Sequence, residues 1–328
     1  MISPDLSIVI VNWNVCDLLE QCLTSILAQA ASDPQSADPG VWKLSGQKLP
    51  APHFEVLVVD SASSDGSVQM VRERFPDVRL YASEVNLGYA AGNNLGIRHS
   101  RGDYILILNP DTRVLPGALG AMLGYAVVHP DVGVLGPQLR YPNGSVQSSR
   151  RRFPTFGTAL IESTFLQKWF PHHPTLRRYY VLDRPDDAIG EVDWLNGSCL
   201  LVRRAVIEQV GDFDEAYFMY SEELDWQKRM REVGWKVVYF PAAQVVHYEG
   251  KSSEQVVAFR HIRFQKSKIR YFKKHHGTAA GEILRYWLLM HYLFEWMVEG
   301  LKWLLGHKRD LRRQRLDEYG QVLRTWLV

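Results

Sequence analysis

The sequence predicts an α/β protein with a mostly parallel central sheet, flanking helices and a C-terminal helical extension. Short apolar runs alternate with helical patterns over the first hundred residues, which is typical of parallel βαβ units. From about residue 252 the chain becomes amphipathic and basic. The composition agrees: 328 residues with 46% hydrophobic and 23% charged side chains exclude disordered and fibrous classes and suffice for one large domain with an appendage.

Apolar periodicity places the elements of the first hundred residues. In chain order we expect a strand at Ser7–Val11, a helix at Cys16–Gln29, a strand at Glu55–Asp60, a helix at Ser67–Phe75 and a strand at Val78–Ala82. Residues 31–53 are rich in Ser, Asp, Pro, Gly and Gln and are longer than most connections in compact domains, so we interpret them as a surface insertion. Residues 86–100, which follow, contain three glycines and paired asparagines.

The same reasoning places the elements between residues 100 and 250. We expect a strand at Tyr104–Leu108, a helix at Pro116–His129, a strand at Gly133–Leu139, and helices at Arg204–Val210 and Ser221–Val233. We also expect ordered segments at Val192–Val202, Lys236–Phe240 and Gln244–His247. Residues 140–190 are rich in Pro, Arg and aromatic side chains and have no clear period, so we predict a loop over the active face.

The charge distribution divides the chain at Gly250. Residues 1–250 carry 22 Lys and Arg against 29 Asp and Glu, a net charge of −7, whereas residues 251–328 carry 16 against 7, a net charge of +9. The total of +2 hides this asymmetry. We therefore predict a catalytic domain over residues 1–250, with the insertion at 31–53, and a basic amphipathic helical extension over residues 251–328.

Three cysteines, Cys16, Cys22 and Cys199, make neither a disulfide framework nor a CxxC metal pattern, which favours a reducing, cytoplasmic location. No secretory signal is visible at the amino terminus. Only residues 283–305 approach the length of a membrane span, and charged residues interrupt them, which favours an interfacial or packed helix.

Polar residues follow three of the predicted strands. They are Asn12, Trp13 and Asn14 after the first strand, Asp60 at the end of the second, and Asn109 and Asp111 after a later one. A helix cap is the competing interpretation for Asp60, and a β-turn for Asp111. Ligands of open parallel sheets lie at the carboxyl ends of the strands, so three such ends together indicate a binding site.

The chemistry suggested by these residues is that of a diphosphate bound through a metal ion. The chain has no P-loop lysine motif and no GxGxxG after a strand, so another group must compensate the charge of a diphosphate. A carboxylate that holds a hard divalent cation would do so, and Asp111 is the best candidate for that ligand.

Several motifs make the sequence resemble family 2 glycosyltransferases with a GT-A fold. In the first half they are LSIVIVNWN (6–14), VVDSASSDGS (58–67), NLGYAAGNN (86–94) and LNPD (108–111). In the second half they are WLNGS (194–198), GDFDE (211–215), FMYSEELD (218–225) and VH (246–247). The resemblance covers roughly residues 5–275, and within the family it is strongest to the rhamnosyltransferase-like branch, which builds bacterial cell-surface polysaccharides.

The resemblance implies a donor site and a metal site. The residues that would bind the nucleotide and sugar of the donor are Val11, Asn12, Trp13, Asn14, Asp60 (against the pyrimidine base), Asn86, Gly88, Asn93, Asn109, Asn196 and Gly197. Asn109 stands where the family usually has the first Asp of an Asp-X-Asp motif. The metal, Mn2+ or Mg2+, would then be held by Asp111 and His247, although a structural histidine is the competing interpretation for His247.

The resemblance also implies an acidic catalytic motif at Glu222, Glu223 and Asp225. By position Glu223 is the general base, which must lie within about 2.6 to 3.2 Å of the acceptor hydroxyl. Asp225 follows Glu222 by three residues on the same helical face, so we expect it to have a supporting role. The competing interpretation is that these acids only charge the first turn of a helix.

The predicted activity is inverting, metal-dependent transfer of a hexosyl or rhamnosyl group from a nucleoside-diphosphate sugar to a hydroxyl of a glycan or lipid-linked acceptor. The donor would be a dTDP- or UDP-sugar, with dTDP-rhamnose favoured by resemblance. A member that binds glycans or sugar nucleotides without turnover is one alternative. A sugar nucleotidyltransferase is another, but the chain lacks the amino-terminal Gly-rich basic loop of that class.

The basic extension has three interpretations. Residues 260–276 fit an ordinary solvated amphipathic helix, and the resemblance adds that such a helix packs beside the donor site. Residues 286–305 carry Trp287, Trp296 and Trp303 and are followed by cations, which fits adsorption to the inner face of the cell membrane. A helical homodimer is the rival. We expect no nucleic-acid partner, because the aromatic residues follow helical spacing.

Overall fold

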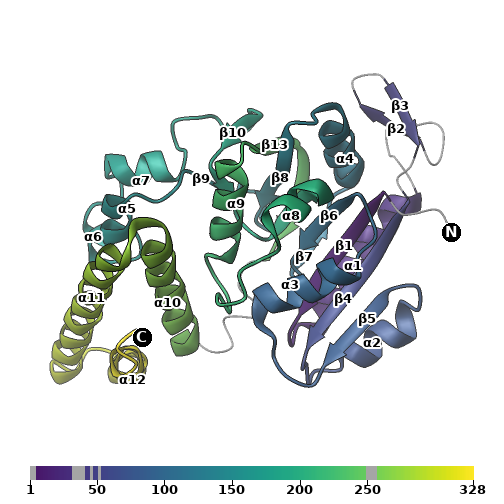
Figure 1. Ribbon diagram of the computed structural model, residues 1–328. Helices are drawn as coiled ribbons and strands as arrows, with labels where there is room; N and C mark the ends of the chain where they lie inside the picture. Colours follow the sequence, from purple (N-terminus) through teal and green to yellow (C-terminus); the bar gives the residue numbers. More distant parts are fainter. Residues whose placement is uncertain (1–4, 32–40, 45–46, 51–52, 249–256) are drawn as a thin grey trace. The chain divides into compact units, whose positions relative to one another are not determined.

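The computed structural model describes residues 5–31, 41–44, 47–50, 53–248 and 257–328 (Figure 1). The chain divides into two compact units. The described parts of 1–152, 184–216 and 222–252 form the first, here called the sheet unit, and those of 153–183, 217–221 and 253–328 form the second, the helical unit. The helical unit thus takes in two segments from before residue 250 in addition to the basic extension.

The sheet unit contains a nine-stranded sheet with the order β10-β13-β8-β12-β6-β1-β4-β5, and β7 pairs with β13. Its strands are β1 (Leu6–Asn12), β4 (Phe54–Ser61), β5 (Arg79–Ser83), β6 (Tyr104–Leu108), β7 (Thr112–Val114), β8 (Val132–Arg140), β10 (Gly190–Val192), β12 (Cys199–Arg203) and β13 (Lys236–His247). Within this sheet, β1, β4, β5 and β6 pair in parallel, as predicted. β12 is antiparallel to both β6 and β8 and so makes the sheet mixed.

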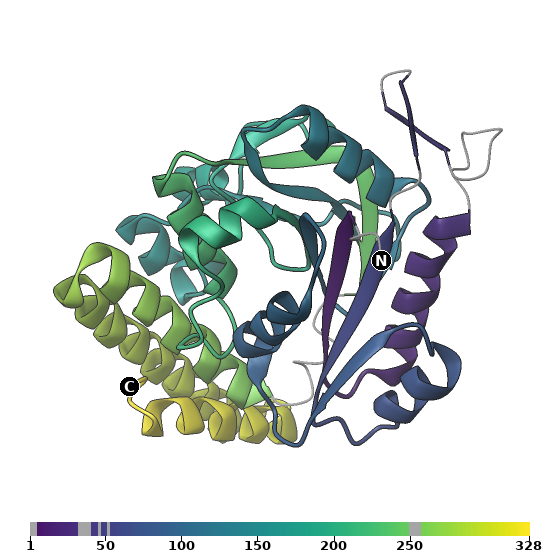
Figure 2. The same ribbon diagram turned by 45° about the vertical axis from the view of Figure 1, so that its right-hand side comes forward.

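Helices cover both faces of this sheet. They are α1 (Cys16–Ala31), α2 (Ser67–Arg74), α3 (Gly88–His99), α4 (Ala118–Val128), α8 (Arg204–Val210) and α9 (Glu222–Glu232). Ile8 and Ile10 of β1 pack into one core with α1, α2 and α4, whereas Val9 packs into a second core with α3, α8 and α9. Figure 2 shows α1 and α3 on opposite sides of the parallel strands. Burial on both faces explains the continuous apolar run of β1.

Glycines allow α3 to lie close to β1. A Cβ atom on Gly92 would come 2.8 Å from Cγ1 of Val11, which is closer than real Cβ contacts, and one on Gly96 would collide with Val9. The glycines spaced by four residues therefore form one face of α3, against which the strand packs. They are a reason for the glycine-rich composition of residues 86–100, and they bring the start of α3 to the carboxyl end of β1.

The three ordered segments expected after residue 190 contain strands. Val192–Val202 includes the end of β10, the short β11 (Trp194–Leu195) and most of β12, separated by residue 193 and by residues 196–198. Lys236–Phe240 and Gln244–His247 both belong to β13, with a register shift between Phe240 and Gln244. The predicted strand at Tyr104–Leu108 and helix at Arg204–Val210 are confirmed to the residue.

The prediction of a loop over residues 140–190 is wrong. The segment contains β9 (Arg150–Arg151), which pairs with β11, and the helices α5 (Phe156–Ile161), α6 (Phe165–Trp169) and α7 (Pro174–Tyr179). Helices of five or six residues are too short to show a period. They are instead defined by caps, since Thr155 and Thr164 accept backbone hydrogen bonds at the first turns of α5 and α6.

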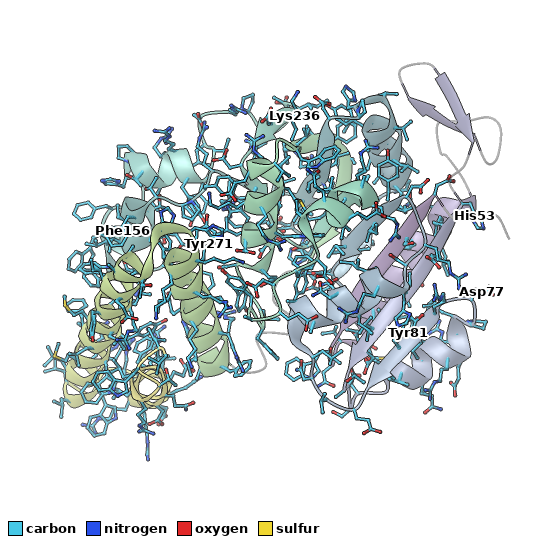
Figure 3. All side chains as sticks on the ribbon, viewed as in Figure 1. His53, Asp77, Tyr81, Phe156, Lys236 and Tyr271 are labelled. Carbon is cyan, nitrogen blue, oxygen red and sulfur yellow. The ribbon has the colours of Figure 1, made fainter. Side chains whose placement is uncertain are left out.

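The helical unit is completed by three long helices, α10 (Val257–His276), α11 (Thr278–Leu304) and α12 (Arg309–Arg324). Trp287 of α11 donates its indole N–H to the carbonyl oxygen of Leu160 at 2.9 Å. The rings of Phe156 and Phe272 lie 6.2 Å apart, and Figure 3 labels Phe156 and Tyr271, the residue before Phe272 in the chain. No helix among the described residues is long and apolar enough to cross a membrane.

The predicted insertion at 31–53 includes a small antiparallel hairpin. β2 (Val41–Leu44) pairs with β3 (Gln47–Pro50), apart from the central sheet. Residues 32–40, 45–46 and 51–52 of the insertion lie outside the described residues, and so do residues 249–256, which hold the predicted domain boundary.

Candidate active site

The polar ends of the parallel strands meet at one edge of the sheet, as predicted. Asn12 of β1 and Asp60 of β4 are register partners, and both side chains are buried. Asn12 Nδ2 donates to Asp60 Oδ2 at 2.9 Å, and the backbone N–H of Ser63 donates to Asp60 Oδ1 at 2.9 Å. The helix-cap interpretation of Asp60 is wrong, because the N-cap residue of α2 is Gly66. Asp60 instead shapes the loop at the end of β4.

The loops after β1 and β4 are bonded to each other. Asn14 and Ala62 both have left-handed backbone conformations, with φ of 52° and 62°. The Ser63 hydroxyl accepts from the backbone N–H of Asn14 at 3.0 Å, and Asn14 Oδ1 accepts from the backbone N–H of Ser64 at 2.8 Å. An alanine in this conformation stores strain, which proteins concentrate at functional sites. The loop that contains Val11 to Asn14 is therefore rigidly shaped.

The start of α3 contributes further predicted residues. Asn86 Oδ1 accepts from the backbone N–H of Gly88 at 2.9 Å, and Gly88 has a positive φ of 75°. Asn93 lies one turn into the helix and donates to the carbonyl oxygen of Tyr89 at 2.9 Å. Its Oδ1 atom is buried without a hydrogen-bond partner among the described residues. Asn93 thus retains a buried acceptor near the end of β1.

The two predicted metal ligands lie together in the sheet unit. β7 follows Asp111, and its antiparallel pairing with β13 makes Thr112 and His247 register partners. Both side chains are buried, and His247 Nε2 lies 3.3 Å from Asp111 Oδ1. Asp111 and His247 are 136 positions apart in the sequence, and the pairing of β7 with β13 brings them together.

Gln147 sets the orientation of the His247 ring. Gln147 Oε1 lies 2.9 Å from His247 Nδ1, and because this oxygen only accepts, Nδ1 carries the proton. The other ring nitrogen, Nε2, faces Asp111 and is the atom available to a metal ion. Ser198 Oγ lies 3.3 Å from the same Nε2 atom. Fixing a histidine tautomer through its other ring nitrogen is typical of metal-binding histidines.

The oxygen and nitrogen atoms near Asp111 and His247 are suitable ligands for a divalent cation. Asp111 Oδ1 and Asn109 Oδ1 are buried and have no hydrogen-bond partner among the described residues. Buried acceptors are rarely left unpaired unless a ligand or ion completes them. No group of three His, Cys, Asp or Glu side chains forms a metal cluster in the described parts of the chain. A cation here would therefore use Asp111, His247 and the amide oxygen of Asn109, with the donor supplying further oxygens.

The acidic motif begins α9. Glu222 is buried and Glu223 is half-buried, and Oε2 of each lacks a hydrogen-bond partner among the described residues. Burial raises the pKa of Glu222 well above the ordinary carboxyl value, and the charge of Glu223 raises it further. Burial also raises the pKa of Glu223, against the opposing effects of backbone N–H groups, including that of Gly197, and of Arg151. The pair therefore shares a proton more readily than isolated carboxyls do.

Residues 195–198 pack against the first turns of α9, next to the acidic pair. Gln227, one turn after Glu223, exchanges two hydrogen bonds with the backbone of Leu195, at 2.8 and 2.7 Å. The Tyr89 hydroxyl donates to the carbonyl oxygen of Gly197 at 2.6 Å. A Cβ atom on Gly197 would lie 3.0 Å from that hydroxyl and 3.6 Å from Cβ of Glu223. The predicted residues Gly197 and Glu223 are therefore neighbours.

Asn196 and Asp225 have structural partners. Asn196 Oδ1 accepts from the backbone N–H of Ser198 at 2.9 Å and from its hydroxyl. Asp225 is fully buried and accepts from Arg229 Nε at 3.1 Å. Arg229 also donates to the carbonyl oxygen of Asp212 at 2.7 Å. This pair links the turn at residues 211–214 to α9, and the supporting catalytic role of Asp225 stays a prediction.

Three residues of the site were not predicted: Tyr89, Gln147 and Ser198. Tyr89 and Ser198 lie inside the family motifs NLGYAAGNN and WLNGS, and this position in the sequence could have identified them as site residues. Gln147 lies in the segment predicted to be a loop, and nothing in its local sequence distinguishes it. Only the hydrogen bond to His247, 100 residues away, identifies it.

Comparison with known proteins shows the family to which the chain belongs. Residues 7–211 match the family described as Glycosyl transferase family 2. The chain belongs to this family. The transferase is 34% identical over 274 residues to the N-acetylglucosaminyl-diphospho-decaprenol L-rhamnosyltransferase of Mycobacterium tuberculosis, covering 79% of this chain and 85% of the relative. It is 26% identical over 246 residues to the rhamnosyltransferase WbbL of Escherichia coli, covering 68% and 83%.

A solved structure agrees with the predicted fold. The mannosyltransferase PcManGT from Pyrobaculum calidifontis, in complex with GDP-Man and Mn2+, superposes on the transferase with a TM-score of 0.53 at 18% identity. The match covers 98% of this chain and 86% of PcManGT. At this identity the likeness shows the fold alone. The predicted GT-A-like fold, a mostly parallel mixed sheet with flanking helices and the C-terminal helices α10 to α12, is confirmed.

Proposed function

We propose that the protein transfers a rhamnosyl group from a nucleoside-diphosphate sugar to a hydroxyl of a lipid-linked glycan, with inversion at the anomeric carbon. The donor is a dTDP- or UDP-sugar, with dTDP-rhamnose as the first candidate. The observation that carries the proposal is the convergence of unpaired buried acceptors from Asn93, Asn109, Asp111, Glu222 and Glu223 in a member of glycosyl transferase family 2. The two rhamnosyltransferase relatives support the choice of sugar.

The acceptor is proposed from the name of one relative. The Mycobacterium tuberculosis enzyme is named for N-acetylglucosaminyl-diphospho-decaprenol as its acceptor, and the chain covers 85% of that protein. We therefore propose a diphosphate-linked polyprenol that carries a sugar as the acceptor class, used in the synthesis of cell-surface polysaccharide. The reaction would take place on the cytoplasmic side of the membrane.

Glu223 is the proposed general base. Within the coupled pair, Glu223 accepts backbone hydrogen bonds and is close to Arg151, which both favour its charged form, whereas Glu222 is the more deeply buried member. Glu222 therefore keeps the shared proton and Glu223 is the carboxylate. Glu223 removes the proton of the acceptor hydroxyl as its oxygen attacks the anomeric carbon. The new C–O bond forms on one face while the bond to the diphosphate breaks on the other, so the configuration inverts.

Asp111, His247 and Asn109 would hold a divalent cation at the diphosphate. Mn2+ or Mg2+ bound there would supply positive charge next to the leaving nucleoside diphosphate. Asp60 and the loop of Val11 to Asn14 would position the nucleotide, and Asn86, Gly88 and Asn93 would line its pocket. Asn196 and Gly197 would form the floor of the sugar site beside Glu223.

The test is turnover of purified full-length protein with Mn2+ or Mg2+, a panel of dTDP-, UDP- and GDP-sugars, and a polyprenyl diphosphate that carries N-acetylglucosamine. We expect a rhamnosylated lipid from dTDP-rhamnose, detected by mass spectrometry, and NMR should show that the anomeric configuration of the product is opposite to that of the donor. Retention of configuration would contradict the mechanism. Binding of the sugar nucleotides in a thermal-shift assay without transfer or donor hydrolysis would instead support the alternative of a non-catalytic member.

A further inference from the structure

An exposed apolar stripe runs along α11 of the helical unit. It consists of Ile283, Tyr286, Met290, Leu293, Met297, Leu301 and Leu304, hereafter the α11 stripe. Successive members are three or four residues apart, which places them on one face of the helix. Their exposed fractions range from 46% at Leu293 to 68% at Leu304. Over 22 residues a helix extends about 33 Å, so the stripe is a long surface.

The other faces of α11 are occupied within the helical unit. Leu284, Leu288 and Tyr292 are buried, and Tyr292 accepts a hydrogen bond from Gln265 of α10. Glu299 is buried and paired with Arg312 of α12 at 2.6 Å. A third side carries Trp287, His291 and Phe294, whose rings contact Phe165 of α6. The α11 stripe is the face that remains.

Exposed apolar residues also lie at and just after the end of α6. Trp169 and Phe170 are 58% and 55% exposed, and the ring of Trp169 lies 5.9 Å from that of Phe294, next to Leu293 in the chain. At the end of α11, Leu305 is also exposed. Large contiguous apolar surfaces on soluble proteins indicate a binding partner.

The charge around the stripe identifies the partner. No member of the stripe is charged, and the exposed Lys308, Arg309 and Arg313 follow its C-terminal end, with the exposed Asp310 among them. The guanidinium of Arg309 lies 5.7 Å from the ring centre of Trp303. Residues 251–328 carry a net charge of +9. A second copy at this face would bring two such segments together and be opposed by repulsion, whereas an anionic surface would attract each of them.

We propose that the α11 stripe, with Trp169 and Phe170, lies on an anionic lipid surface. The stripe would enter the boundary between headgroups and acyl chains, with α11 parallel to the membrane and the cations at its end among the headgroups. Each Lys or Arg near such a surface contributes about 1 kcal/mol. This agrees with the finding that no described helix is able to cross a membrane. The inference concerns bulk lipid and holds whichever sugar and acceptor the active site uses.

The experiment is co-sedimentation of the full-length protein, without substrates, with phosphatidylcholine vesicles and with mixed phosphatidylcholine–phosphatidylglycerol vesicles. The test variant is M290Q/M297Q/L301Q. The matched control is V127Q/V128Q/V233Q, which replaces exposed apolar residues of the sheet unit: Val127 and Val128 lie on α4, and Val233 follows α9. Because all six positions are exposed, both variants should fold, which circular dichroism checks. We expect salt-sensitive binding of the wild type to the anionic vesicles, a fall of about tenfold or more in the test variant, and no change in the control.

Three outcomes would overturn the proposal. They are no binding of the wild type to anionic vesicles, equal binding of the wild type and the M290Q/M297Q/L301Q variant, and equal losses in the test and control variants. Sedimentation velocity without lipid gives the competing answer: if the wild type does not bind vesicles and the test variant converts a dimer to a monomer, a second copy covers the stripe. Transfer to a soluble acceptor is assayed separately, so a failure of the proposed function leaves the vesicle result intact.

Discussion

The sheet unit and the helical unit differ in the partners of their buried carboxyl groups and in the apolar side chains that α11 exposes. At the carboxyl end of its strands, the sheet unit buries acceptors from Asn109, Asp111 and Glu222 that have no partner among the described residues. The helical unit instead pairs its most buried acid, Glu299, with Arg312 and Lys302, and leaves large apolar side chains of α11 exposed. Unpaired polar groups indicate a polar ligand, whereas exposed apolar groups indicate an apolar surface.

From this difference we predict that substitutions in the two units affect activity and stability differently. Buried polar groups without partners cost free energy that is recovered only when a ligand binds, so substitutions there should change activity more than they lower stability. The paired acid of the helical unit should show the reverse. The predictions below test this contrast, and they are arranged by the size of the expected effect.

The largest effect is expected for Glu223→Gln. Gln cannot accept the proton of the acceptor hydroxyl, so turnover should fall by a factor of about 10³, while donor binding stays close to that of the wild type. Nucleoside diphosphate release measures turnover, and thermal shift with the donor measures binding. Glu222→Gln is the matched control, because Gln resembles the neutral carboxyl that we assign to Glu222. Similar losses in the two variants would contradict the assignment of the base.

The next effect is expected for Arg312→Ala in the helical unit. Arg312 Nη1 donates to Glu299 Oε2 at 2.6 Å, and its removal leaves a buried carboxylate with fewer partners. We expect the free energy of unfolding to fall by about 3 kcal/mol, measured by urea denaturation. Arg313→Ala, an exposed neighbour on the same helix, is the control and should change stability little. If both variants lose the same stability, the buried pair does not stabilise the unit.

A smaller effect, on metal binding, is expected for Gln147→Ala. Without its acceptor oxygen, the His247 ring loses the hydrogen bond that holds the proton on Nδ1. The affinity for Mn2+, measured by electron paramagnetic resonance without nucleotide, should fall by about 10- to 100-fold. Gln147→Glu retains an acceptor oxygen and should keep most of the affinity. Unchanged binding in Gln147→Ala would show that Gln147 does not position His247 for the metal.

The smallest effect is the pH dependence of stability in Glu222→Gln. Because the pKa of Glu222 is raised in the folded protein by burial and by Glu223, its contribution to stability is present below the ordinary carboxyl pKa and is lost as pH rises through the raised value. Gln has no charge to bury, so the variant should be more stable than the wild type at alkaline pH, on the order of 1 kcal/mol, and equal to it in acid. A variant less stable than the wild type at alkaline pH would contradict the raised pKa.

Local patterns predicted most of the sheet unit. The strands at Leu6–Asn12 and Tyr104–Leu108 were predictable because strands buried on both faces need continuous apolar residues. The helix at Ser67–Arg74 was predictable from its helical period. The short helices α5 to α7 did not follow, since one to two turns contain no period, and their caps could equally begin turns. The segments 153–183 and 217–221 join the helical unit through tertiary contacts that no local pattern expresses.

By itself, then, the sequence determined which residues follow each strand and which family motifs they form, and so the predicted positions of Asn12, Asp60, Asp111 and Glu223. Local order suffices for this, because neighbours in the chain set both the period and the motif spacing. Only the tertiary structure decided that Gln147 orients His247, that Gly197 lies against Glu223, and that one face of α11 stays exposed. These three features depend on contacts between segments that are far apart in the sequence. Such hydrogen bonds and buried surfaces exist only once the chain has folded.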